Sequence, residues 1–155
     1  MHESMDSNIS PYRQVHANAH AAVGGRPRVL VAEDEWAFRV LLLLAFEDDG
    51  YDVVTVGNGP KLLEVLASSI LPNSGIEPFD LVVSDVRMPG WSGLLALEDL
   101  CRSQLVPPVV VITAFGSDEL HQRAEQAGAA AVLDKPFDLA ELTALGRRLV
   151  SQHAT

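Results

Sequence analysis

Short apolar segments alternate with longer segments of helical periodicity from residue 28 onward. The apolar segments are rich in Val, Leu and Ile and lack polar alternation, which indicates strands buried on both faces. They cover residues 29–32, 51–56, 79–84, 109–113 and 130–133. Helices are predicted over residues 36–49, 59–69, 92–102, 117–128 and from 138 onward. This alternation predicts an α/β fold in which right-handed crossovers join a parallel sheet that carries helices on both faces.

Residues that favour helix ends support these boundaries. Gly50 and Gly128 follow the first and fourth predicted helices, where glycine commonly ends a helix in a left-handed conformation. Pro60 suits the first turn of the second helix, and Ser117 can cap the fourth. The segment 70–78 contains Pro, Gly and Asn and is predicted to be a loop.

Side chains with potential chemistry follow four of the five predicted strands: Glu33, Asp34, Asp85, Thr113 and Lys135. The carboxyl ends of parallel strands share one edge of the sheet, and open α/β sheets bind ligands there. If the strand order is 2-1-3-4-5, the first and third strands are neighbours and these side chains converge on the crevice between them. Each residue alone has an ordinary explanation, such as an Asx turn for Asp85. Their occurrence at four strand ends favours a functional site.

The predicted cluster combines carboxylates with a hydroxyl and an ammonium group. Carboxylates packed together repel one another, which raises their pKa values unless a cation is present. Oxygen ligands without His or Cys favour a hard cation such as Mg²⁺. A carboxylate beside Mg²⁺ can attack phosphorus as a nucleophile. Phosphoryl transfer depends mainly on positioning and charge neutralisation, which Mg²⁺ and Lys135 would provide.

Composition restricts the classes of protein to which the chain can belong. Its 155 residues, 48% of them hydrophobic, suit one globular domain. The formal net charge of −10 argues against direct nucleic-acid binding, which needs clustered Lys and Arg. The single cysteine, Cys101, excludes an internal disulfide and a cysteine-rich zinc site.

The first part of the chain differs from the rest. Residues 1–27 are rich in Ser, Asn, His and Ala and show little periodicity, so a flexible N-terminal arm is expected. No basic-then-apolar signal pattern is present there, and no apolar run approaches the length of a membrane span. A cytoplasmic protein without membrane insertion is therefore expected.

Residues 28–152 resemble the receiver domain of two-component response regulators. The matching motifs occur in order at the strand ends: residues 29–35 (Val-Leu-Val-Ala-Glu-Asp-Glu), 85–90 (Asp-Val-Arg-Met-Pro-Gly) with Gly93, 113–114 (Thr-Ala) and 135–137 (Lys-Pro-Phe). The resemblance implies a flavodoxin-like, doubly wound fold with a five-stranded parallel sheet in the order 2-1-3-4-5. It also implies that Asp85 accepts a phosphoryl group from a sensor histidine kinase or a histidine phosphotransfer protein.

The resemblance also assigns roles around the metal. Asp34 and Asp85 would ligate Mg²⁺ directly, together with the backbone carbonyl of Arg87. Glu33 would act more through water, and Lys135 would hold a phosphate oxygen. The chain would assist its own phosphorylation and dephosphorylation without being an enzyme in the usual sense.

A conformational switch is implied as well. The hydroxyl of Thr113 would move onto the phosphate, and the bond between Lys135 and Pro136 is expected to be cis. In the family, phosphorylation shifts the face built from the fourth helix, fifth strand and fifth helix. The family often has Tyr or Phe three residues before the lysine, whereas this chain has Val132. This departure concerns the aromatic part of the switch, not phosphorylation itself.

Other classes of function fit the sequence less well. An aspartyl-phosphate hydrolase usually carries a second Asp two residues after the nucleophile, where this chain has Arg87. A transcription factor that binds DNA directly is disfavoured by the acidic composition. The alternative that stays open is a receiver-like interaction module that works without phosphorylation. We expect a stand-alone response regulator or phosphorelay intermediate, a monomer or weak homodimer, which acts on a downstream protein target.

The first predicted helix is apolar around most of its circumference, whereas a surface helix usually shows a narrower apolar stripe. Some of Leu42, Leu43 and Phe46 are therefore expected to be exposed, as a docking patch for a kinase or phosphotransfer partner. The alternative is that neighbouring loops or the N-terminal arm cover these side chains.

Overall fold

The structure is a computed structural model that describes residues 25–88, 96, 98–99, 106–114 and 116–154. Its elements, in chain order, are β1 (Arg28–Ala32), α2 (Trp36–Asp48), β2 (Asp52–Val56), α3 (Gly59–Ile70), β3 (Leu81–Asp85), β4 (Val109–Thr113), α5 (Asp118–Ala127), β5 (Ala131–Asp134) and α6 (Leu139–Ala154). Most of the predicted arm (1–27) and most of the predicted helix 92–102 lie outside the described residues.

All five strands pair in parallel in the order β2-β1-β3-β4-β5, which confirms the predicted doubly wound sheet. Strands β3 and β4 are buried at every position because helices cover both of their faces. Strand β3 lies between β1 and β4, with Val31 opposite Val83 and Asp85 opposite Ile112. The end of β3 is therefore flanked by strand ends on both sides.

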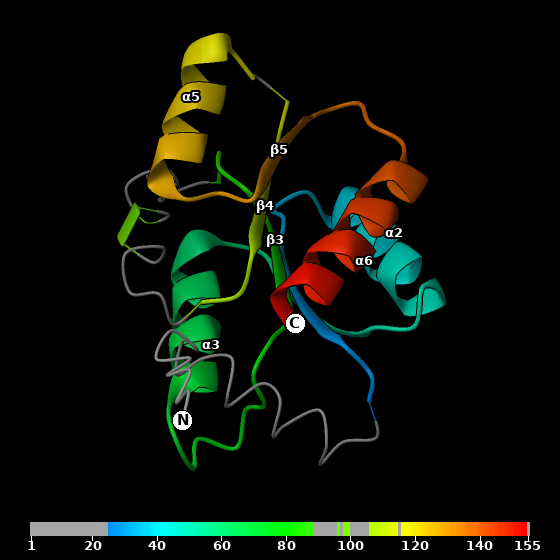
Figure 1. Ribbon diagram of the computed structural model, residues 1–155, viewed down its shortest axis with the longest axis vertical. Helices are drawn as coiled ribbons and strands as arrows, with labels where there is room; N and C mark the ends of the chain where they lie inside the picture. Colours follow the sequence, from blue (N-terminus) through cyan, green and yellow to red (C-terminus); the bar gives the residue numbers. More distant parts are fainter. Residues whose placement is uncertain (1–24, 89–95, 97, 100–105, 115, 155) are drawn as a thin grey trace, which may run out of the picture.

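The helices form a layer on each face of the sheet. Figure 1 shows α3 and α5 on one side of the sheet and α2 and α6 on the other. Leu30 and Val82 pack with the α3–α5 layer, whereas Val31 and Val83 pack with the α2–α6 layer. Neighbouring strand residues face opposite layers because side chains alternate along a strand. The strands thus bury apolar side chains on both faces, as their uniform composition predicts.

Local interactions begin and end the helices where the sequence indicates. The Asn58 side chain accepts a 2.7 Å hydrogen bond from the backbone N–H of Lys61 at the start of α3. The Ser117 hydroxyl accepts one from Leu120 at the start of α5, as predicted. Gly128, with φ of 104°, follows α5 in the left-handed conformation that glycine adopts readily.

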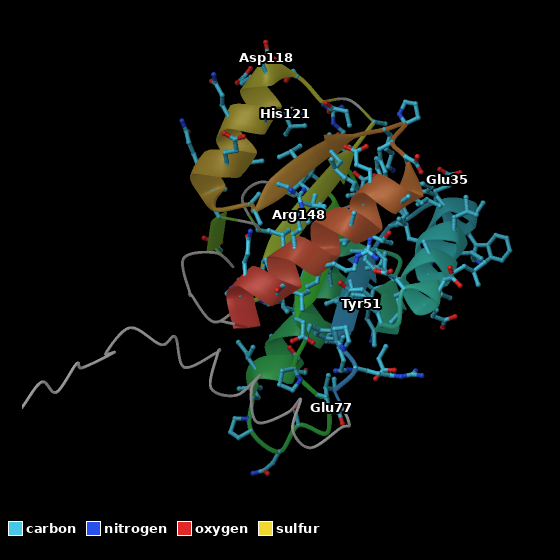
Figure 2. All side chains as sticks on the ribbon, turned by 45° about the vertical axis from the view of Figure 1, so that its right-hand side comes forward. Glu35, Tyr51, Glu77, Asp118, His121 and Arg148 are labelled. Carbon is cyan, nitrogen blue, oxygen red and sulfur yellow. The ribbon has the colours of Figure 1, made fainter. Side chains whose placement is uncertain are left out.

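A side-chain contact also joins helix α5 to strand β5. His121 Nε2 lies 2.9 Å from Asp134 Oδ2 at the end of β5. A carboxylate can only accept, so Nε2 carries the proton. Figure 2 shows His121 and Asp118 on α5, on the far side of the molecule from α2.

One sequence-based expectation about α2 is wrong. Leu42 and Phe46 are completely buried, because this side of the helix packs against the sheet and α6, and Leu43 is half-buried. The exposed apolar side chains are instead Trp36 (70% exposed), Leu41 (49%) and Leu44 (54%). Apolar side chains are therefore exposed on this helix, but they are not the ones that were expected.

Among the residues that the structure describes, no helix is both long and apolar enough to cross a membrane.

Candidate functional site

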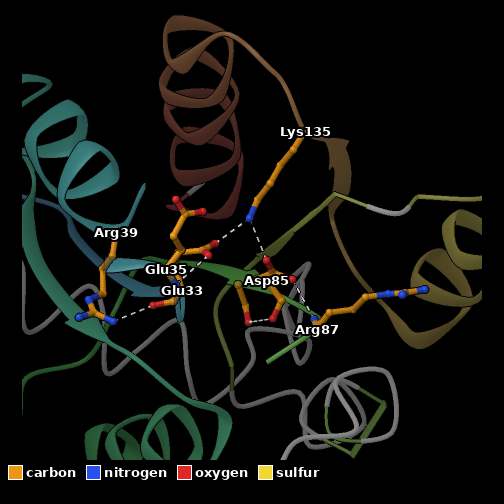
Figure 3. Close-up of polar contacts among 7 residues, drawn as sticks. Glu33, Glu35, Arg39, Asp85, Arg87 and Lys135 are labelled. Carbon is orange, nitrogen blue, oxygen red and sulfur yellow. Dashed lines mark hydrogen bonds and ion pairs between the residues drawn. The ribbon is translucent and has the colours of Figure 1, made fainter. Parts of the chain in front are cut away.

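Asp85 is the last residue of β3 and is 5% exposed. Its Oδ1 accepts a 2.8 Å hydrogen bond from the backbone N–H of Arg87, which is the Asx-turn interaction that follows many strands. Its Oδ2 accepts a 2.9 Å hydrogen bond from Lys135 Nζ. Figure 3 shows both interactions, and the Arg87 side chain points away from Asp85. Asp85 therefore makes the expected Asx-turn interaction and, with its other oxygen atom, contacts the lysine from the end of β5.

Lys135 connects the strand ends. Its ammonium group bridges Asp85 Oδ2 at 2.9 Å and Glu33 Oε2 at 3.0 Å. The ammonium also lies 4.7 Å from the centre of the Phe38 ring, within the range of a cation–π contact. Burial acts to lower the pKa of Lys135, but the hydrogen bonds and charges of the two carboxylates outweigh burial and raise it. Lys135 is therefore held as a cation at this edge of the sheet.

The backbone of Lys135 is equally constrained. Its N–H donates a 2.7 Å hydrogen bond to the carbonyl of Thr113. The peptide bond to Pro136 is cis, which confirms the sequence-based expectation. The hydrogen bond to Thr113 fixes the backbone from which the lysine side chain reaches the carboxylates.

Glu33 is the most enclosed carboxylate of the group, with 1% of the residue exposed. Its Oε1 accepts a 3.2 Å hydrogen bond from the Glu35 N–H, and its Oε2 accepts the bond from Lys135. Burial raises the pKa of Glu33, Lys135 opposes this rise, and the charge of Asp85 adds to it. An additional cation at the site would relieve part of this cost.

The structure brings together the carboxylates that the sequence analysis singled out. Oxygen atoms of Glu33, Asp34 and Asp85 lie within 4.8 Å of one another. Asp34 is exposed, whereas the other two are buried, so the cluster opens to solvent on the Asp34 side. This all-oxygen set fits a hard divalent cation, and the exposed side leaves room for its water ligands.

The predicted switch residues lie in β4 and β5, the two strands beyond β3. Thr113 is the last residue of β4 and is fully buried. It pairs with Asp134 of β5 and follows Ile112, which pairs with Asp85. Val132, in β5, is half-buried against the α3–α5 layer.

Sequence reasoning did not identify Arg39, the basic residue of α2. Arg39 Nη1 donates a 2.9 Å hydrogen bond to the backbone carbonyl of Glu33. The available signal was its position: Arg39 is a single basic residue between the apolar side chains of the first turn and the apolar run Val40–Phe46. Its partner is a backbone atom, which a side-chain pattern does not reveal.

Comparison with known proteins adds the family context. The family model of the response regulator receiver domain matches residues 29–146. The chain is 40% identical over 116 residues to the transcriptional regulatory protein PdtaR of Mycobacterium tuberculosis. That alignment covers 74% of this chain and 52% of the relative, so the chain spans about half the length of this relative.

Solved structures with the same architecture include two response-regulator proteins. The receiver domain of Francisella response regulator 1452 is 26% identical, with a TM-score of 0.72, and the match covers 82% of this chain and 98% of that one. The Vibrio cholerae chemotaxis protein CheY4 is 27% identical, with a TM-score of 0.68, and the match covers 80% and 98%.

Proposed function

This chain belongs to the family of response regulator receiver domains, and we propose that it is a phosphoacceptor of a two-component system or phosphorelay. Asp85 accepts a phosphoryl group from a phosphohistidine donor, with Mg²⁺, and the modification changes the contacts that the protein makes. The observation that carries the proposal is the Lys135 ammonium, which bridges Asp85 and Glu33 within a cluster of carboxylates.

The transfer exchanges one bond for another. A carboxylate oxygen of Asp85 bonds to phosphorus as the bond from phosphorus to the donor's imidazole nitrogen breaks, and the imidazole leaves. Lys135 then releases the Asp85 oxygen and holds a phosphoryl oxygen, close to its present position. Buried charges act strongly here because little water screens them.

The cation would be held by this chain's oxygen atoms. Asp34 and Asp85 are its proposed direct ligands, with the backbone carbonyl of Arg87, and Glu33 acts through water. Mg²⁺ would neutralise charge on the carboxylates and on the phosphoryl group as it is transferred. The opening on the Asp34 side gives the donor and the metal's waters access to the site.

The phosphoryl group would be detected by residues on the adjoining strand ends. Thr113 and Lys135 are linked through the hydrogen bond between their backbones, so a movement of either is transmitted to the other. We propose that they shift the face formed by α5, β5 and α6 and thereby change binding to a downstream protein target. The half-buried Val132 supplies no ring to this switch.

The exposed patch of Trp36, Leu41 and Leu44 on α2 is the proposed contact for the phosphohistidine donor. Trp36 begins α2 two residues after Asp34, so a protein seated on this patch also borders the opening of the site. The donor is the partner that must reach Asp85 directly. Large exposed apolar side chains gathered on one element are typical of protein contacts.

The extent of the signalling unit, its location and its oligomeric state belong to the same proposal. We propose that residues 28–152 form the signalling unit and that it acts in the cytoplasm as a monomer or weak homodimer. It assists phosphorylation and dephosphorylation of its own Asp85 and turns over no separate substrate.

The direct test is intact-mass analysis after incubation with acetyl phosphate and Mg²⁺. The proposal expects one phosphoryl increment that requires Mg²⁺ and that disappears in Asp85→Asn. A phosphohistidine donor provides a second source if acetyl phosphate reacts slowly. A folded chain that takes no phosphoryl group from either source would favour an interaction module that works without phosphorylation.

A further inference from the structure

We propose that Arg39 is a positioning residue that, together with Gly57, holds the segment 33–35 so that its carboxylates are placed for a divalent cation. This inference rests on the proposed function, because it assigns a role to a residue that supports the same site. Arg39 lies on the first turn of α2, beside the cluster but outside the set of carboxylates (Figure 3).

Arg39 is bonded to the residues on both sides of Asp34. Its Nη1 donates to the Glu33 carbonyl at 2.9 Å. Its backbone N–H donates to the Glu35 carbonyl, also at 2.9 Å. The Arg39 side chain thus holds the chain that enters Asp34, and the first backbone hydrogen bond of α2 holds the chain that leaves it, which restricts movement of Asp34 away from the other carboxylates.

The Arg39 guanidinium bonds to the backbone carbonyl of Glu33 and not to its carboxylate. A guanidinium group that paired with a carboxylate would compete with a metal ion for its oxygen atoms. Arg39 holds Glu33 through the main chain, so this bond uses none of the oxygen atoms of the Glu33 carboxylate. The carboxylate remains available to Lys135 and to water around a cation.

Gly57 provides the space for the guanidinium. A Cβ at position 57 would lie 2.6 Å from Arg39 Nη1 and 3.5 Å from Arg39 Cζ. The preceding residue, Val56, accepts a 3.1 Å hydrogen bond from the Glu33 N–H. Both backbone groups of Glu33 are therefore fixed at this point, one by the end of β2 and one by Arg39.

The test compares Mg²⁺ affinity in the full chain and in Arg39→Ala, Gly57→Ala, the double variant and Arg39→Lys, with amide chemical shifts as the readout. Loss of one hydrogen bond predicts that Arg39→Ala weakens Mg²⁺ binding about 3- to 10-fold. Gly57→Ala should weaken it in the same direction, because its methyl group displaces the flexible end of Arg39. Arg39→Lys retains a donor and should restore part of the affinity.

The double variant of Arg39→Ala and Gly57→Ala tests whether Gly57 acts through Arg39. If Gly57 acts through Arg39, the double variant binds Mg²⁺ no more weakly than Arg39→Ala alone. Arg147→Ala, which removes an exposed arginine paired with Asp49, is the control and should leave Mg²⁺ affinity unchanged. Thermal melts confirm that each variant is folded.

Two results would overturn the inference: Arg39→Ala binding Mg²⁺ like the unaltered chain, or additive losses in the double variant. Both leave the phosphorylation of Asp85 in the unaltered chain intact, so they do not affect the proposed function. Failure of the proposed function appears separately, as an unaltered chain that gains no phosphoryl mass. An unaltered chain that binds no Mg²⁺ would overturn the inference and the proposed metal site together.

Discussion

Lys135 Nζ donates a 2.9 Å hydrogen bond to Asp85 Oδ2, although 50 positions separate the two residues in sequence. The bond places a positive charge at the oxygen atom to which we propose that a phosphoryl group is transferred. Sheet pairing makes the contact possible, because β4 lies between β3 and β5 and aligns their carboxyl ends.

Lys135→Ala tests this charge. We expect the rate of Mg²⁺-dependent phosphorylation by acetyl phosphate to fall about 10²-fold, as for removal of one preorganised charge from a reacting centre. Intact-mass time courses measure the rate. Lys61→Ala removes an exposed lysine of α3 and should have no effect. An unchanged rate in Lys135→Ala would show that the ammonium group does not contribute to transfer.

The donor contact on α2 can be separated from the chemistry at Asp85. Leu44→Asp should slow transfer from a phosphohistidine protein about 10-fold or more, since it places a charge within an apolar contact. Phosphorylation by acetyl phosphate should stay unchanged, because a small donor needs no docking surface. Leu71→Asp, which alters another exposed leucine, is the control. Equal loss with both donors would count against docking at this patch.

Tyr51 predicts a specific dependence of stability on pH. Burial, aided by the charges of Asp49 and Asp80, raises its pKa from the ordinary value of 10.0 to about 12, although Arg147 partly opposes the rise. Between these two values the unfolded chain loses the phenol proton while the folded chain retains it, so the free energy of unfolding falls as pH rises.

The comparison of the unaltered chain with Tyr51→Phe isolates this contribution. Chemical denaturation at a series of pH values should show a steeper decline above pH 10 in the unaltered chain than in the variant. Ultraviolet titration of the variant should also lack a phenol that ionises near pH 12. Parallel stability curves for the two proteins would contradict the prediction.

The orientation of α2 is testable through stability. Phe46→Ala should lower the free energy of unfolding by about 3–5 kcal/mol, because it leaves a cavity in a fully packed region. Leu41→Ala should change it by less than about 0.5 kcal/mol, because that side chain is half exposed. Urea denaturation measures both. Similar losses in the two variants would mean that the helix is rotated from the position described.

Much of the architecture follows from local sequence. The uniformly apolar strands, the capping Ser117 and the terminal Gly128 act through short-range interactions, and the structure agrees with each. The set Glu33, Asp85 and Lys135 could also be anticipated, because a parallel sheet places all carboxyl strand ends at one edge. The resemblance to a family supplied the strand order, which local pattern alone leaves open.

Which side of α2 is buried and what Arg39 contacts could not be predicted from the sequence in the same way. A helix that is apolar on most sides does not indicate which side is buried. Exposure was expected for some of Leu42, Leu43 and Phe46, but the first and last are fully buried and Leu43 is half-buried. The contact of Arg39 depends on a carbonyl and on empty space at Gly57, and neither is a property of a side-chain pattern.

The sequence by itself determined which segments become strands and helices and which reactive side chains stand at the strand ends, because periodicity, turn residues and caps act over a few neighbouring positions. Tertiary structure alone decided which side of α2 is buried and how the segment around Asp34 is held. These depend on packing and hydrogen bonds between residues that only the folded chain brings together, such as Arg39, Glu33 and Gly57.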